Sequence, residues 1–336
     1  MQKVSARAWR EISARCKPAL LALCLMGAGA GYSVPAQADA LGARHNFFIN
    51  LSRSGSSLGI HETKSRAYPT LIRGMYVLTT TEGKFLGFIN EPGTLFGDFR
   101  GLNVLSPTGG PQRPLSRDEA AALRAEIMAS LDYDQLIKVT HGDGGGRRLL
   151  MLSAIDCPYC KKLEDTFRES KKTVDTTFYV LPSSLQPIDK GGMQPWQAVS
   201  RIWCAENNGS AWNDYWKEKK LPAQRDCAFD AQNAAKQRRY VVEILRATGL
   251  EISGTPTIVR EDGSNVPLST YSDPNTRAAT YGPSGHPQSQ VKPNWLAYAP
   301  AEAGPDAAVA TGTAPAAGQQ APGKVNLKDA LNKLFN

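Results

Sequence analysis

The sequence predicts a mixed fold in two parts, with α+β character in the first part and α/β character in the second. From residue 74 to residue 105, short β-prone runs alternate with turn residues, which predicts a small antiparallel sheet. Further along, the continuous apolar run at residues 149–155 leads directly into an amphipathic helix, and another strand is expected at residues 178–181. This strand–helix–strand order indicates an α/β unit, and 336 residues are enough for both parts.

The first 38 residues have the composition of a secretory signal peptide. Five basic side chains and one acid precede or flank an apolar stretch at residues 19–30, and Ala36 and Ala38 are the small residues that a signal peptidase recognises. We therefore expect export and cleavage after Ala38, with an uncleaved anchor as the alternative. Loss of residues 1–38 lowers the formal charge from +8 to +4, and no dense Lys/Arg run remains, which argues against nucleic-acid binding.

The first folded part is expected at residues 39–113. Its opening segment, residues 39–69, is polar and rich in Gly and Ser, and we assign no element or role to it. The sheet begins with the runs at residues 75–80 and 84–90, and further β-prone residues continue to residue 105.

Residues 114–146 are expected to form a connecting helix and a joint. Ser116 and Glu119 have the spacing of a capping box, which marks the start of a helix. Apolar residues follow at spacings of four, at Leu123, Ile127 and Leu131. The Gly-rich stretch at residues 141–146 is interpreted as a flexible joint rather than a phosphate-binding loop, because no strand pattern precedes it.

The second folded part is expected at residues 147–270. After the first two strands, helices are expected at about residues 195–206, 210–218 and 230–248, followed by a hairpin of residues 257–260 and 266–268.

Residues 271–323 are rich in Pro, Gly, Ser and Ala, which predicts a linker, and residues 324–336 regain helical spacing. The apolar positions of that last helix are Leu327, Leu331, Leu334 and Phe335. We consider two roles for it, as a final helix packed on the second sheet or as a free amphipathic tail.

Four cysteines remain after the signal peptide. Cys157 and Cys160 form a C-x-x-C pair at the junction between the apolar strand and its helix. The first sulfur then lies at a helix N-terminus, where unpaired N–H groups and the helix dipole stabilise a thiolate, while the second is held one turn further on. We interpret Cys157 as the attacking sulfur and Cys160 as the resolving sulfur. Half of a zinc site and a purely structural disulfide are the alternatives.

Cys204 and Cys227 carry no sign of activation. We interpret them as a structural disulfide, worth roughly 3 kcal/mol on the loop-entropy model. An even number of cysteines in an exported chain is typical of an oxidising compartment.

Three motifs together resemble a known family, the bacterial periplasmic thiol:disulfide isomerases of the DsbC and DsbG type. They are Cys157-Pro158-Tyr159-Cys160 after a hydrophobic strand, Cys204 with the later Cys227, and Thr255-Pro256 before a hairpin. The resemblance covers roughly residues 70–270. The cysteine pair 204/227 is nearer the DsbC branch, while the Pro-Tyr dipeptide is nearer the DsbG branch, so both branches remain open.

The resemblance implies a thioredoxin-fold catalytic domain with inserted helices, preceded by a cystatin-like dimerisation domain at residues 39–113 and a linker helix. It implies that Pro256 is in the cis form and that Pro158, Tyr159, Thr255 and Pro256 form the active-site loops that meet substrate. It also implies a V-shaped homodimer in the periplasm, kept reduced by a membrane thiol reductase of the DsbD type.

The expected function is therefore reduction and isomerisation of non-native disulfides in misoxidised exported proteins, with no cofactor and no metal. Two other functions remain open. One is net thiol oxidation, and the other is a chaperone or assembly factor of an envelope machine.

Overall fold

The computed structural model describes residues 35–144, 147–170, 173–282 and residue 296. Most of the predicted signal peptide and the whole predicted helix at residues 324–336 lie outside this range. None of the helices in the described ranges is both long enough and apolar enough to cross a membrane.

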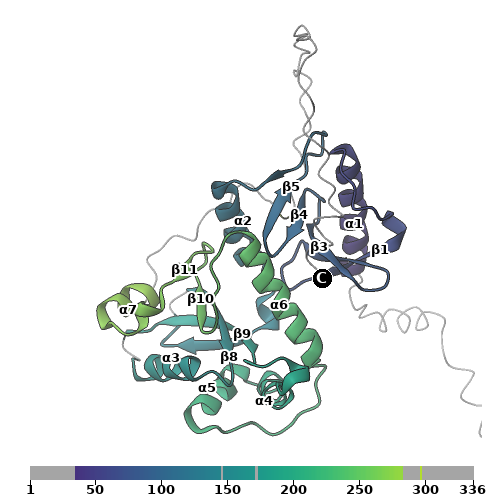
Figure 1. Ribbon diagram of the computed structural model, residues 1–336. Helices are drawn as coiled ribbons and strands as arrows, with labels where there is room; N and C mark the ends of the chain where they lie inside the picture. The colour runs from purple at the N-terminus through teal and green to yellow at the C-terminus, as the bar shows by residue number, and fades with distance from the viewer. Residues whose placement is uncertain (1–34, 145–146, 171–172, 283–295, 297–336) are drawn as a thin grey trace, which may run out of the picture. The chain divides into compact units, whose positions relative to one another are not determined.

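The first part is a six-stranded antiparallel sheet in which the order of the strands equals their order along the chain (Figure 1). The strands are β1 (Ser65–Pro69), β2 (Met75–Thr80), β3 (Phe85–Asn90), β4 (Leu95–Asp98), β5 (Gly101–Val104) and β6 (Arg113–Pro114). The predicted antiparallel sheet is therefore confirmed. Strand β1 extends it into the segment for which the sequence predicted no element, after a single 3-10 turn, η1 (Glu62–Lys64).

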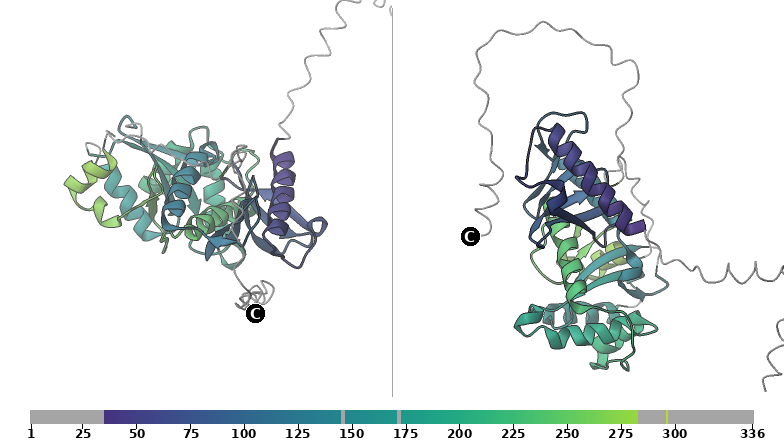
Figure 2. Two further views of the ribbon diagram at one scale, coloured as in Figure 1. Left: turned by 90° about the horizontal axis from the view of Figure 1, so that it is seen from above. Right: turned by 90° about the vertical axis from the view of Figure 1, so that its right-hand side faces the viewer.

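Helix α1 (Pro35–Arg53) covers one face of this sheet (Figure 2). Its buried side chains recur every three or four residues, at Ala40, Ala43, Phe47 and Leu51. The turn after β3 meets the helix closely: Gly93 has φ +66°, and a Cβ there would collide with the backbone of Phe47. The Asn50 amide donates hydrogen bonds to the carbonyls of Pro92 and Gly93 at 3.0 and 3.1 Å, which fixes the helix on the turn.

Helix α2 (Arg117–Ser130) follows the sheet and has the predicted capping box, in which Ser116 and Glu119 each accept a hydrogen bond from the other's backbone N–H. Leu123, Ile127 and Leu131 are buried in one cluster with residues from the sheet. A short 3-10 helix, η2 (Tyr133–Gln135), follows α2. The backbone N–H of the buried Leu296 donates a hydrogen bond to the Glu126 carboxylate of α2 at 2.9 Å.

The second part contains a five-stranded sheet of order β11-β10-β8-β9-β7. Strands β8 (Arg148–Ala154) and β9 (Thr176–Ser183) are parallel and are connected by helix α3 (Pro158–Glu169), as the strand–helix–strand prediction requires. The predicted hairpin is present as β10 (Thr257–Val259) and β11 (Asn265–Val266).

Strand β7 (Ile137–His141) is the edge strand of this sheet, and it lies in the segment that the sequence analysis interpreted as a joint. The sheet therefore begins before residue 147. Ile137 and Val139 are buried and Lys138 and Thr140 are exposed, which is the alternation of a half-buried strand. The adjacent Gly-rich run hid this short pattern.

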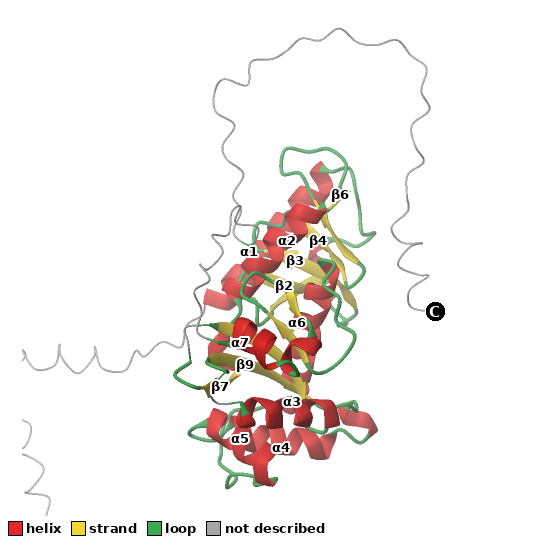
Figure 3. Ribbon diagram, turned by 90° about the vertical axis from the view of Figure 1, so that its left-hand side faces the viewer, coloured by secondary structure: helices red, strands yellow, loops and turns green. Residues whose placement is uncertain are grey.

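Three helices connect β9 to β10, near the positions predicted. They are α4 (Met193–Trp203), α5 (Asn208–Glu218) and α6 (Ala231–Ala247), preceded by the 3-10 turn η3 (Ile188–Lys190). Helices α3, α4 and α5 lie together on one side of the five-stranded sheet, and α6 lies on the other (Figure 3). Trp212 and Trp216 of α5 are buried and belong to the core on that side of the sheet.

A helix directly follows the hairpin, which the sequence analysis did not expect. After η4 (Leu268–Tyr271), helix α7 (Pro274–Tyr281) begins with Asp273 as its N-cap. Tyr281 is fully buried, and its ring lies 4.9 Å from the ring of Phe167 in α3. The start of the predicted linker at residue 271 is therefore wrong, because this aromatic contact makes residues 271–282 part of the folded unit.

Candidate active site

The C-x-x-C pair lies at the end of β8 and the start of α3. Cys157 is the N-cap residue of α3, and Pro158 occupies the first turn, where a missing N–H has no cost. The Cys157 N–H donates to the carbonyl of Ala154 at 3.0 Å, and the Cys157 carbonyl accepts from the N–H of Lys161 at 3.1 Å. The strand-to-helix turn thus fixes the first sulfur at the positive end of the helix.

Both cysteines of the pair are free thiols, and both are buried. The exposed fraction of Cys157 is 4%, that of Cys160 is zero, and the intervening Tyr159 is 70% exposed. The site therefore presents an aromatic side chain to the surroundings, with the sulfurs beneath it.

The second loop of the site contains Thr255 and Pro256. Their peptide bond is cis, as the resemblance implies. The Cys157 thiol donates to the Thr255 carbonyl across 3.4 Å. Strand β10 begins immediately afterwards and pairs Thr257 with Leu152 of β8, which sets this loop beside the end of β8. The structure thus brings together Cys157, Cys160 and Thr255–Pro256, which are far apart in the sequence.

The pKa of the Cys157 thiol is lowered from its usual value. Burial is the largest effect and raises the pKa, but donors that favour the thiolate together outweigh it. They are the backbone N–H groups of Cys160 and Tyr159, the Thr255 hydroxyl and the Cys160 thiol, which stabilise the sulfur when it loses its proton. This is the stabilisation that a helix N-terminus gives to a thiolate.

The pKa of the Cys160 thiol is raised to about 12. Burial is again the largest cause, and the neighbouring Cys157 sulfur raises the pKa further. The Ser153 hydroxyl and the Ala154 N–H act in the opposite direction without overcoming burial. The two thiols are thus different in acidity: Cys157 loses its proton more easily than a free cysteine, and Cys160 loses its proton less easily.

Asp156 precedes the first cysteine and is exposed. Its carboxylate accepts hydrogen bonds from the Leu185 N–H and the Ser184 hydroxyl, both at 2.9 Å. These contacts fasten the active-site turn to the loop after β9.

A disulfide joins Cys204, at the end of α4, to Cys227, with 5.8 Å between their Cα atoms, as the sequence interpretation expects. A groove of about 870 Å³ runs along this disulfide and reaches Asp156 and Tyr215. It connects the surroundings of the second cysteine pair with the edge of the first.

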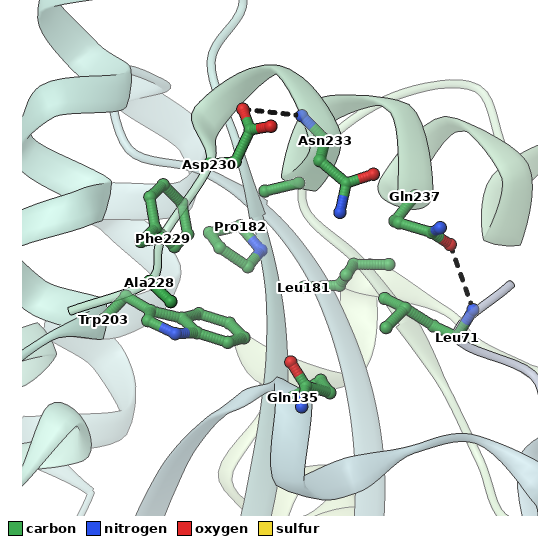
Figure 4. Close-up of a pocket in the computed structure, with 11 residues that line it drawn as sticks. Leu71, Gln135, Leu181, Pro182, Trp203, Ala228, Phe229, Asp230, Asn233 and Gln237 are labelled. Carbon is green, nitrogen blue, oxygen red and sulfur yellow. Dashed lines mark hydrogen bonds between the residues drawn. The ribbon is translucent and has the colours of Figure 1, made fainter. Parts of the chain in front are cut away.

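A smaller pocket of about 110 Å³ lies at the start of α6 (Figure 4). The ring of Trp203 and the side chains of Gln135 and Asn233 surround it, and the Gln237 amide oxygen accepts from the Leu71 N–H at 3.1 Å. No residue that the sequence analysis proposed for the site lines this pocket.

Two residues near the sulfurs were missed by the sequence analysis. Ser153 is a polar residue inside the apolar run of β8, and this interruption was the one available signal. Arg238 lies in α6 and interacts electrostatically with Cys160, which is 78 positions earlier in the chain. No local sequence pattern predicts an interaction between residues so far apart. Within the described residues, no group of three or more His, Cys, Asp or Glu side chains is arranged to hold a metal ion.

Comparison with known proteins now adds to this geometry. Residues 133–279 match the model of the family described as "Thioredoxin-like domain". These residues form a thioredoxin-like domain. Its limits include β7 and most of α7, two elements that lie outside the bounds predicted for the second folded part.

Two curated relatives match a little less than half of this chain. A protein of Bordetella avium named "Probable thiol:disulfide interchange protein DsbC" is 29% identical over 159 residues, which cover 46% of this chain and 50% of the relative. A protein of the same name from Bordetella parapertussis is 28% identical and covers 45% of this chain and 50% of the relative. The chain thus spans about half the length of the curated relatives it matches, and over this half the DsbC-type resemblance is supported.

Among solved structures, a disulfide interchange protein from Neisseria gonorrhoeae aligns with 23% identity and a TM-score of 0.33. The alignment covers 45% of this chain and 99% of that chain.

Proposed function

We propose that this protein reduces and isomerises non-native disulfides in exported proteins, with Cys157 as the nucleophile and Cys160 as the resolving thiol. The proposal is carried by one observation. Two buried thiols share one helix turn, and the pKa of the first is lowered while that of the second is raised to about 12. A thioredoxin-like domain and relatives named as thiol:disulfide interchange proteins support it.

In the first step, the Cys157 thiolate attacks one sulfur of a client disulfide. A bond forms between Cys157 and that sulfur, the client disulfide breaks, and the second client sulfur leaves as a thiolate that takes a proton from water. The thiolate is the attacking species, so a lowered pKa keeps Cys157 reactive at neutral pH.

The mixed disulfide then has two outcomes. Another client thiolate displaces Cys157 and forms a new pairing, which is isomerisation. Alternatively, Cys160 attacks Cys157 and releases the client as a dithiol, which is reduction. A lowered pKa makes Cys157 a better leaving group in both outcomes, because a stabilised thiolate departs more easily.

The cis Thr255–Pro256 loop is proposed to receive the client chain beside the sulfurs, with Pro158 and Tyr159 on the opposite side. The exposed ring of Tyr159 offers apolar area at this position. The disulfide between Cys204 and Cys227 is proposed to be structural and to hold the inserted helices.

For the whole protein, we propose a periplasmic location after cleavage at Ala38, a homodimer formed through the domain at residues 39–113, and reduction of the pair by a membrane thiol reductase of the DsbD type. Strand β1 supports the dimer, because β2 is its one neighbour among the described residues and no described strand pairs with its other edge. Light scattering of the purified chain will give the oligomeric state.

The test is recovery of native activity from a scrambled multi-disulfide protein in a glutathione buffer. We expect the chain lacking residues 1–38 to accelerate recovery, and Cys157→Ser to abolish the acceleration. Cys160→Ser is expected to retain rearrangement by client thiols but to accumulate mixed disulfides, since resolution by Cys160 is lost.

Equal recovery with Cys157→Ser and the unaltered chain would overturn the proposal and would favour a chaperone or assembly role. Faster oxidation of a fully reduced client, with no effect on a scrambled one, would favour a net thiol oxidase.

A further inference from the structure

Three buried polar atoms around the two sulfurs have no hydrogen-bond partner within the described residues. They are the Ser153 hydroxyl oxygen, the Thr255 hydroxyl oxygen and the Nε of Arg238. Buried polar groups are nearly always paired in folded proteins, so an unpaired group at a reactive site suggests a partner that forms during the reaction. Each of the three atoms belongs to a side chain that donates hydrogen bonds.

The Thr255 side chain acts on the Cys157 sulfur. Its own carbonyl accepts the Cys157 thiol at 3.4 Å, and its hydroxyl helps to lower the pKa of that thiol, although burial is the largest effect there and raises it. A hydroxyl that has no acceptor when Cys157 is protonated gains one when the sulfur becomes a thiolate.

Ser153 and Arg238 both interact with Cys160. Ser153 is the penultimate residue of β8 and is fully buried, and its hydroxyl favours the thiolate form of Cys160. Arg238 lies in α6 one turn after Ala234, which packs against the same buried cluster as Cys160. Strand β8 and helix α6 thus each place one donor side chain beside the cluster that contains the Cys160 sulfur.

Arg238 also lacks a carboxylate partner. No ion pair joins it to an Asp or Glu within the described residues, whereas its neighbour Arg239 pairs with Glu243 at 2.6 Å. Burial and the nearby Arg246 together lower the pKa of Arg238 to about 10, although the Cys160 thiolate acts to raise it. A buried Nε without an acceptor is costly, which makes a transient anion at Cys160 a favourable partner for the guanidinium.

We propose that Ser153 and Arg238 stabilise the Cys160 thiolate when it resolves the mixed disulfide, and that they are positioning residues for reduction rather than for the first attack by Cys157. The inference rests on the function proposed above and assigns its second step. Cys160 gives its proton to solvent, and its thiolate bonds to the Cys157 sulfur. The bond between Cys157 and the client sulfur breaks, and that sulfur leaves as a thiolate and is protonated by water. The client is reduced and the pair becomes a disulfide.

The experiment separates the two steps with the reagent 5,5′-dithiobis(2-nitrobenzoate) and the reduced full chain. Attack by Cys157 releases one coloured thiolate and leaves a mixed disulfide, and attack by Cys160 releases a second. A Cys160→Ser variant, which gives one release instead of two, assigns the phases.

We expect Ser153→Ala and Arg238→Met each to slow the second release by roughly ten-fold, the effect of one pKa unit on the fraction of thiolate, and to leave the first release unchanged. The rate of the second release rises with pH in all variants, and in these two the rise is displaced to higher pH. Arg238→Lys is expected to restore much of the rate because it keeps the charge.

Arg239→Met is the matched control, since it removes a cation from the same helix at an exposed position away from the sulfurs. Thermal unfolding of each variant checks its fold, and Ser153→Ala keeps the test open if Arg238→Met does not fold. A second release as fast as in the unaltered chain, or equal slowing of both releases, would overturn the inference. If the unaltered chain did not release the first coloured thiolate, the proposed function would be overturned, and this inference with it.

Discussion

Cys157 and Cys160 are three positions apart on one helix, yet their thiols have opposite pKa shifts. The difference lies in the hydrogen-bond donors that face each sulfur. The first sulfur faces the free N–H groups of the first turn of α3, which outweigh its burial, while the second is one turn inside and fully buried. Single donors such as the Thr255 and Ser153 hydroxyls therefore have a large influence on the chemistry of this site.

Glu164 is a buried carboxyl group on the same helix, and it makes stability depend on pH. Burial raises its pKa from 4.5 to about 7, against the Trp212 indole N–H, which donates at 2.7 Å, and against Arg168. Because the pKa is raised in the folded state, its stabilising contribution is complete below about 4.5 and is lost as the pH rises through about 7.

We expect Glu164→Gln to remove this loss, which is at most about 3 kcal/mol between mildly acidic and mildly alkaline pH. Glutamine keeps an acceptor for Trp212 and does not ionise. Urea unfolding at both pH values measures the difference. Glu169→Gln, at an exposed position of α3, is the control, and an equal pH dependence in Glu164→Gln and the unaltered chain would contradict the prediction.

At the scale of elements, α7 shows how a short helix becomes part of a domain. It has eight residues, too few to be stable alone, and Tyr281 anchors it between the rings of Phe167 and Phe178 at 4.9 and 5.9 Å. The Arg147 guanidinium also donates to the carbonyl of Thr280. The helix is therefore held from the sheet and from α3.

We expect Tyr281→Ala to lower the free energy of unfolding by about 3–5 kcal/mol, as for other large buried aromatic residues. Tyr281→Phe keeps the ring and loses the hydroxyl contact with Thr270 at 3.2 Å, so it should cost only about 1 kcal/mol. Denaturant unfolding followed by circular dichroism compares the two variants. Equal stability of Tyr281→Ala and the unaltered chain would mean that α7 does not pack on α3.

The elements that the sequence predicted are those with strong local signals. The capping box of Ser116 and Glu119 marks α2, and turn residues separate β2 and β3. Helix α1 was missed because its buried face includes small residues, Ala40 and Ala43, among polar ones, so its apolar periodicity is weak. Strand β7 and helix α7 were missed because they are short and lie beside Gly- or Pro-rich residues, and packing on distant parts of the chain stabilises them.

At the scale of the whole molecule, the disulfide between Cys204 and Cys227 ties the end of α4 to the irregular segment that precedes α6. The segment between Glu218 and Ala231 contains no helix or strand, so the bond supplies order that hydrogen bonding there does not. Both cysteine pairs could be predicted from the sequence, because the C-x-x-C spacing marks the first pair, and the signal peptide with an even number of cysteines indicates a disulfide for the second. It did not reveal Arg238, since the approach of α6 to Cys160 depends on the assembled fold.

We expect the double variant Cys204→Ala/Cys227→Ala to lose about 3 kcal/mol of stability on the loop-entropy model while Cys157 remains reactive. Denaturant unfolding with and without a reductant provides the check. Reductant should lower the stability of the unaltered chain to that of the variant and should not affect the variant. A variant as stable as the unaltered, oxidised chain would show that the bond is not structural.

The strand order of the first sheet has a consequence for the timing of synthesis. Each strand pairs with the strand next to it in the chain, so each pairing closes only a short loop and needs no residue from the second half. Because chains are made from the N-terminus, all six strands are synthesised before Cys157. Every strand pairing of this sheet therefore lies within a stretch of chain that is made before the reactive thiol.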